Sequence, residues 1–167
     1  MKSLFFILLC FCLNIGQPFA QERSADLDIS DLKVTDLELS EFKTDYCTMF
    51  FEGTVTRPGV WKECCFNHDL RYWFGGAKKE QLKSDQLLKQ CVRKKAGSFW
   101  ANLMYSGVRA GHYSPIKNKY QWGWGWSKNR KPFKALTRKE KEYIRDELGK
   151  LNLEESFLRG FIKRYHL

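Results

Sequence analysis

The sequence predicts a mainly α-helical domain organised around two antiparallel helices. The first, from about Pro58 to Gly75-Gly76, has a proline suited to a first helical turn and two glycines that end it. The second runs from about Lys78 to Lys95, with Leu82, Asp85, Leu88 and Val92 spaced by three and four residues. In an antiparallel pair the numbers of facing residues add to a nearly constant value. His68 with Asp85 and Cys64 with Cys91 both meet this condition, so one packing brings both pairs together.

Residues 1–20 are typical of a secretory signal peptide. Met1-Lys2 is a short basic start, Leu4 to Leu13 is almost entirely apolar, and Ala20 is a small residue before the expected cleavage. The alternative, an uncleaved anchor, is disfavoured because polar residues follow from Gln21 onward. We therefore expect a secreted or periplasmic protein.

Residues 21–44 form an acidic leader ahead of a basic domain at 45–167. Residues 21–45 hold eight acidic and three basic side chains, whereas 46–167 hold 25 basic and 11 acidic ones. Four consecutive five-residue units in 25–44 are similar to pentapeptide repeats, but they would form at most one coil of a β-helix. We expect the leader to pack against, or pair electrostatically with, the basic body. For an exported protein that charge favours phospholipid surfaces over nucleic acid, the alternative being solubility alone.

Four cysteines remain after the signal peptide, namely Cys47, Cys64, Cys65 and Cys91. An even number in an oxidising compartment predicts two disulfides, and a bond between neighbouring Cys64 and Cys65 would strain a helix. The antiparallel packing assigns Cys64 to Cys91, which leaves Cys47 for Cys65. A zinc site made of Cys64, Cys65, His68 and Cys91 is the alternative.

The pattern of residues 96–167 predicts three further helices and a long loop. A third helix is expected over Ser98 to Gly111, with Phe99, Trp100, Leu103, Met104 and Val108 in the core. A long basic and aromatic loop follows from Tyr113 to Phe133. Capping boxes at Thr137 with Glu140 and at Asn152 with Glu155 then open two short helices. The last helix carries one apolar face of Phe157, Leu158, Phe161, Ile162 and Tyr165. His112 and His166 are expected to be exposed or structural.

The first helix and Asp85 together suggest hydrolytic chemistry. A carboxylate on one ring nitrogen of His68 would fix its tautomer and leave the other nitrogen free to take a proton. Asp69 projects about 100° away and is free to bind a hard cation with carbonyls of the Cys47 loop. A base beside a cation suggests ester hydrolysis. The alternative is a buried core histidine beside a solvated aspartate.

The motif Cys64-Cys65-x-x-His68-Asp69-x-x-Tyr72, with Asp85 six residues before Cys91, resembles the secreted phospholipase A2 family. The resemblance covers residues 45–95 and implies a phospholipase A2-like core, a calcium ion and both disulfides above. It implies His68 as the base for water attacking the sn-2 ester, supported by Asp85 and Tyr72. It also implies calcium ligands from the Asp69 side chain and, by position, from the carbonyls of Tyr46, Thr48 and Phe50.

The chain departs from that family's pattern in three places. The loop after Cys47 is poor in glycine, so a shifted loop would use Gly53 or the Glu52 carboxylate instead. The usual β-wing has no room between the two helices, and residues 96–167 match nothing in the animal enzymes.

The aromatic loop is the first candidate for membrane contact, because indoles and basic side chains suit the lipid headgroup region. Its residues are Trp122, Trp124, Trp126, Lys128, Arg130 and Lys131, with the terminal helix as second choice. The alternative is that the tryptophans cover the helices. Single-stranded nucleic-acid binding also fits the loop's composition, but the signal peptide argues against it. The leading hypothesis is a calcium-dependent phospholipase A2-like hydrolase, with a catalytically weak member that binds membranes or a partner as the alternative.

Overall fold

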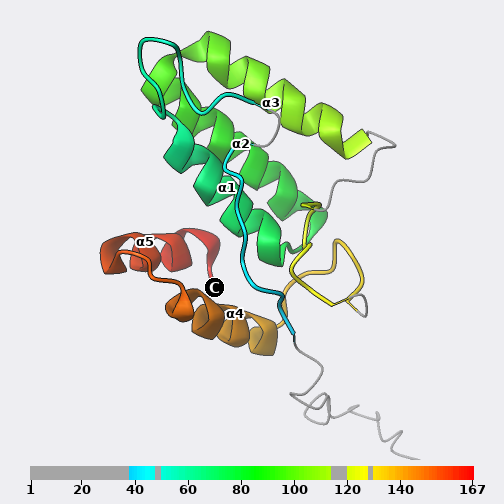
Figure 1. Cartoon of the computed structure of the whole chain (residues 1–167). Coiled ribbons are helices and arrows are strands. Elements are labelled where there is room, and N and C mark those ends of the chain that lie inside the picture. Colours follow the sequence, from blue (N-terminus) through cyan, green and yellow to red (C-terminus); the bar gives the residue numbers. More distant parts are fainter. Residues whose placement is uncertain (1–37, 48–49, 114–119, 128–129) are drawn as a thin grey trace, which may run out of the picture. The chain divides into compact units, whose positions relative to one another are not determined.

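A computed structural model of the protein describes residues 38–47, 50–113, 120–127 and 130–167, and these fold into a mainly helical structure (Figure 1). The helices are α1 (Lys62–Phe74), α2 (Lys78–Ala96), α3 (Ser98–Tyr113), α4 (Arg138–Lys150) and α5 (Glu155–Tyr165). The described residues contain no strand, only two isolated antiparallel bridges. None of the helices in this part of the chain has the length and apolar character needed to cross a membrane. The predicted signal peptide and most of the acidic leader lie outside the described residues.

The start of α1 differs from the prediction. The helix begins at Lys62 rather than near Pro58, because Gly59 has a φ of 72°, which is outside the right-handed helical region, and a tight turn at residues 54–57 comes before it. Thr54 and Arg57 exchange two backbone hydrogen bonds of 3.1 Å. Trp61 follows the turn fully buried, and its indole N–H donates to the carbonyl of Phe51. The residues between the turn and α1 are thus held by a buried side chain.

The connection between α1 and α2 follows the prediction. Gly75 ends α1 with a φ of 63°, and a Cβ there would lie 2.7 Å from the Cα of Gly123. Only glycine meets both requirements. At the start of α2, the Glu80 carboxylate accepts from the Ala77 N–H at 2.7 Å and pairs with buried Arg71 at 3.3 Å. The short turn therefore returns α2 alongside α1.

Two disulfides confirm the predicted pairing and the antiparallel arrangement. Cys64 bonds to Cys91 between α1 and α2, and Cys47 bonds to Cys65 between the preceding loop and α1. Helix α3 packs on α2. The three helices and the loop enclose one core cluster, which contains Trp61, Leu88, Val92, Ala101, Met104 and the buried cysteines.

Two side-chain placements on these helices differ from the prediction. The buried side of α2 consists of Gln81, Ser84, Asp85, Leu88 and Val92, while Leu82 is exposed. On α3, Phe99 and Leu103 are exposed rather than in the core. In both helices, the neighbouring helices bury fewer of the apolar side chains than the sequence pattern predicts.

Helices α4 and α5 build a second core cluster with α1. It joins Leu70, Trp73 and Phe74 of α1 to Ile144 and Leu148 of α4, and to Phe161 and Tyr165 of α5, as the apolar face of the last helix predicted. The capping box of Thr137 with Glu140 is confirmed. The second predicted box is wrong, since Glu154 rather than Asn152 caps α5 by accepting from the Ser156 N–H.

The end of the leader, residues 38–44, packs on this second cluster through apolar side chains. Leu39 is buried and Phe42 contacts Phe66 and Trp73. The Ser40 N–H donates to the Gly125 carbonyl at 2.7 Å, and the Trp73 indole donates to the Ser40 carbonyl at 2.9 Å. Within this described stretch, Glu41 pairs with its neighbour Lys43. Apolar packing, backbone hydrogen bonds and a hydrogen bond from the Thr44 hydroxyl to Asp69 hold this stretch against the body.

Candidate functional site

The centre of the site is the buried carboxylate of Asp85, which α2 places between α1 and α3. Its side chain is fully buried. Oδ1 lies 2.9 Å from Nε2 of His68 and accepts from the Tyr72 hydroxyl at 2.6 Å. Helical spacing places His68 and Tyr72 one turn apart on the same face of α1, which is why one carboxylate oxygen meets both. The structure brings the three predicted catalytic residues together.

The other carboxylate oxygen of Asp85 faces α3. Arg109 donates to Oδ2 at 3.0 Å, and Nε2 of His112 lies 3.1 Å from the same atom. Nε2 of His112 is also 2.9 Å from the Tyr72 hydroxyl oxygen, and its Nδ1 is 3.2 Å from the Gln81 amide nitrogen. His112 was predicted to be exposed or structural; it is partly buried and joins the network around Asp85, with partners that the sequence pattern did not indicate.

The charge state of Asp85 follows from these partners. Burial opposes its charged form, but hydrogen bonds from His112, His68 and Tyr72 outweigh that cost and hold the pKa of Asp85 well below its usual range. Burial, with Asp85 beside it, raises the pKa of the Tyr72 hydroxyl far above its ordinary value. Asp85 is thus an ionised acceptor, and Tyr72 is a permanent donor.

The ionised state of Asp85 determines which ring nitrogen of His68 carries the hydrogen. A carboxylate can only accept, so Nε2 of His68 carries the hydrogen that faces Asp85. In the neutral ring Nδ1 therefore has a free lone pair. The Tyr72 hydroxyl donates its hydrogen bond to Asp85, so its oxygen accepts from Nε2–H of His112. Nδ1 of His68 is therefore able to take a proton, while the hydrogen bond from Nε2–H to Asp85 fixes the orientation of the ring.

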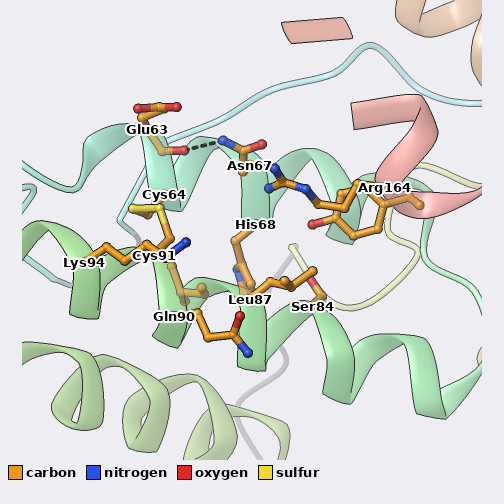
Figure 2. A pocket seen from close by; sticks show the side chains of 12 residues that line it. Glu63, Cys64, Asn67, His68, Ser84, Leu87, Gln90, Cys91, Lys94 and Arg164 are labelled. Carbon is orange, nitrogen blue, oxygen red and sulfur yellow. Dashed lines mark hydrogen bonds between the residues drawn. A yellow bond between two sulfur atoms is a disulfide. The ribbon is translucent and has the colours of Figure 1, made fainter. Parts of the chain in front are cut away.

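His68 also lines a pocket of about 300 Å³ between α1, α2 and α5 (Figure 2). Asn67 comes from α1, Ser84 and Lys94 from α2, and Arg164 from α5. The volume is at the lower end of the range for small-molecule sites. The terminal helix therefore contributes one cationic side chain, Arg164, to the pocket that His68 lines.

Asp69, on the neighbouring face of α1, has a separate environment. The Thr44 hydroxyl donates to its Oδ2 at 2.6 Å, and the Tyr46 N–H donates to the Thr44 oxygen at 2.9 Å. Burial raises the pKa of Asp69 from 3.8 to about 7, with Asp45 adding to the rise and the Thr44 hydrogen bond opposing it. A desolvated carboxylate beside a second one fits a hard cation, which would neutralise both.

The other predicted calcium ligands are only partly described. Thr48 lies outside the described residues. The Phe50 N–H donates to the Cys47 carbonyl, and its ring packs near Trp61 and Trp100. Glu52, the alternative ligand, pairs with Lys62 at 3.5 Å. In the described part of the chain no three His, Cys, Asp or Glu side chains gather as a metal-holding group, and a site of one carboxylate with backbone carbonyls does not require one.

The zinc alternative is excluded by the cysteine pairing, because Cys64, Cys65 and Cys91 are all in disulfides. A disulfide sulfur is not the thiolate that zinc binds.

The predicted membrane-contact residues lie in varied surroundings. Trp122 is buried and donates to the Gly76 carbonyl at 2.7 Å, and Trp126 donates to the Phe74 carbonyl at 2.6 Å. Trp124 is partly buried beside Tyr120. Arg130 pairs with Glu140 at 2.7 Å, Lys131 is exposed, and Lys128 lies outside the described residues. Two of the three indoles thus complete the end of α1, and the loop's part in membrane binding stays a prediction.

Fold and site define a mainly helical, disulfide-linked domain with an ionised aspartate buried between two histidines. Searches of protein-family models, curated proteins and solved structures find no match to the chain.

Proposed function

We propose that the protein is an exported, calcium-dependent hydrolase similar to phospholipase A2, which releases fatty acid from phospholipid. The observation that carries the proposal is the contact of His68 with Asp85, 2.9 Å long and buried, beside the desolvated carboxylate of Asp69. A buried aspartate that holds a histidine for proton transfer, next to a candidate cation site, is suited to the attack of water on an ester.

His68 would act as the general base. Its Nδ1 would accept the proton of the attacking water, while Asp85 stabilises the imidazolium through Nε2–H. Tyr72, Arg109 and His112 keep Asp85 ionised and fixed in place, as their contacts of 2.6 to 3.1 Å indicate. Each of these residues acts on the reaction through Asp85 and is a positioning residue.

Asp69 would hold calcium with the carbonyls of the Cys47 loop. The bound ion would supply electrostatic stabilisation of the negative charge that develops on the ester oxygen. The Cys47–Cys65 disulfide supports this role, because it anchors the loop four residues before Asp69 on the same helix. Basic side chains along residues 46–167 would favour substrate in an anionic surface.

The second candidate is a catalytically weak or inactive protein of the same kind that binds membranes or a partner. It is favoured by the surroundings of Asp69, whose Oδ2 already accepts from Thr44, and by the pairing of Glu52 with Lys62. Under this candidate the network around Asp85 serves stability alone.

Fatty-acid release from mixed anionic vesicles, with calcium or with EDTA, separates the two candidates. We expect release by the wild type only with calcium, and a loss of at least about a hundredfold in His68→Gln. His166→Gln is the matched control, since His166 is exposed and caps the C-terminal end of α5. Equal release by wild type and His68→Gln, or none by the wild type at millimolar calcium, would reject the hydrolase.

A further inference from the structure

One end of the molecule exposes apolar side chains that the core does not use. They are Phe51 and Val55 from the loop before α1, and Phe99 and Leu103 from α3. Their exposed fractions are 77%, 102%, 70% and 45%. Phe99 and Leu103 are four residues apart and so share one face of α3. We call these four residues the apolar end.

Contacts beneath the surface join the two segments. Phe51 packs against Phe50, Phe50 against Trp100, and Trp100 against Phe99, with ring centroids 5.2 to 6.3 Å apart. Arg57 donates to the Lys95 carbonyl at 3.1 Å, which ties the turn carrying Val55 to the last residues of α2. Figure 1 shows the same arrangement, with the loop lying where α2 ends and α3 begins. These contacts hold the loop that carries Phe51 and Val55 against the start of α3, the helix that carries Phe99 and Leu103.

The charge around this surface is positive. The two stretches that form it, residues 50–63 and 93–103, hold five basic and two acidic side chains. The acidic ones pair locally, Glu52 with Lys62 and Glu63 with Lys95. Arg57, Arg93 and Lys94 are exposed. Exposed aromatic and aliphatic side chains on segments that also carry exposed cations fit the interface of an anionic bilayer, where apolar groups enter the acyl region and cations meet phosphates.

We propose that the apolar end is the surface by which the protein docks on anionic phospholipid, in place of the tryptophan loop. Two of the loop's three indoles give their N–H groups to carbonyls at the end of α1, whereas Phe51 and Phe99 lie in solvent. The identity of the partner rests on the proposed function, but docking itself requires neither calcium nor hydrolysis.

Vesicle flotation in EDTA, with all proteins carrying His68→Gln, measures docking without catalysis. Protein purified from an exporting host is mixed with phosphatidylcholine vesicles, with or without phosphatidylglycerol. We expect binding to the anionic vesicles and a fall of about tenfold or more in Phe51→Ser/Phe99→Ser, because two exposed rings are lost from the acyl region. Arg93→Gln should lower binding by about fivefold, and only on anionic vesicles.

Two matched controls complete the design. Phe133→Ser removes another exposed phenylalanine, 45% accessible and outside the apolar end, and should not alter binding. Trp124→Ala tests the tryptophan loop. Unchanged binding in the double serine variant, or a larger loss in Trp124→Ala, would overturn the proposal. A dimer that sedimentation detects in the wild type and the double variant abolishes would assign the surface to a second copy instead. Binding retained without any hydrolytic activity in the unmodified protein would reject the proposed function alone.

Discussion

Replacing Asp69 by asparagine should make the calcium-free protein more stable at alkaline pH. The folded protein holds the proton of Asp69 more tightly than the unfolded chain does, because the pKa is raised from 3.8 to about 7. For a carboxyl group with a raised pKa, the extra stability is complete below about pH 4. It is lost as the pH rises toward the folded pKa.

The size of the effect follows from the interval that is titrated. From pH 5 to the folded pKa of about 7 there are about two units, each worth about 1.4 kcal/mol of unfolding free energy. The wild type should therefore lose at most about 3 kcal/mol between pH 5 and pH 8, and less because Asp69 is partly exposed to solvent. Asparagine does not ionise, so the Asp69→Asn variant should lack this loss.

Urea unfolding in EDTA, followed by tryptophan fluorescence at pH 5 and at pH 8, gives the required free energies. The quantity to compare is the unfolding free energy of the variant minus that of the wild type. This difference should be more positive at pH 8 than at pH 5. Asp146→Asn, which removes an exposed carboxylate on α4, should show no such growth. A difference for Asp69→Asn that is the same at both pH values would refute the reasoning.

Three further changes test the packing around the site. Replacing both Cys64 and Cys91 by serine should lower the unfolding free energy by about 3 to 4 kcal/mol in non-reducing urea titrations, since the bond closes a separation of 27 residues; a change near zero would contradict the entropic account. Arg109→Met should cost about 1.5 to 3 kcal/mol, because it removes a charged donor from buried Asp85, and Arg109→Lys should recover part of this; an unaltered urea midpoint would show that the contact is not made. Trp122→Phe should cost about 1 to 3 kcal/mol in thermal unfolding by leaving the Gly76 carbonyl unpaired, and an unchanged melting temperature would argue against that bond.

The helix pair was predictable from the sequence because its constraints are mutual. Cys64 with Cys91 and His68 with Asp85 require the same antiparallel register, and glycines mark the turn between the helices. Both disulfides, and the contacts of His68 and Tyr72 with Asp85, follow from that register. The apolar face of α5 was equally clear, because its five residues recur at helical spacing.

Other features depend on which segments meet, and local patterns do not contain that information. Arg109 and His112 reach Asp85 because α3 packs on α2. In the sequence, the one sign of this was that the two residues are three apart and so share a face of the predicted third helix. The alternating tryptophans fit a membrane surface as well as a cover for α1. Asn152 and Glu154 are both able to accept a hydrogen bond at the start of a helix. The connection after α4 ends at Glu154, so Glu154 rather than Asn152 is the residue that caps α5.

The most direct test of the central claim is the tautomer of His68 in solution. Nitrogen-15 NMR of the imidazole side chains above the titration range distinguishes a protonated nitrogen from one with a free lone pair. We expect Nε2 of His68 to carry the proton and Nδ1 to hold a free lone pair, and we expect Asp85→Asn to disturb this preference. A proton resident on Nδ1 in the wild type would contradict the proposed role of His68, because Nδ1 could then not accept the proton of the attacking water.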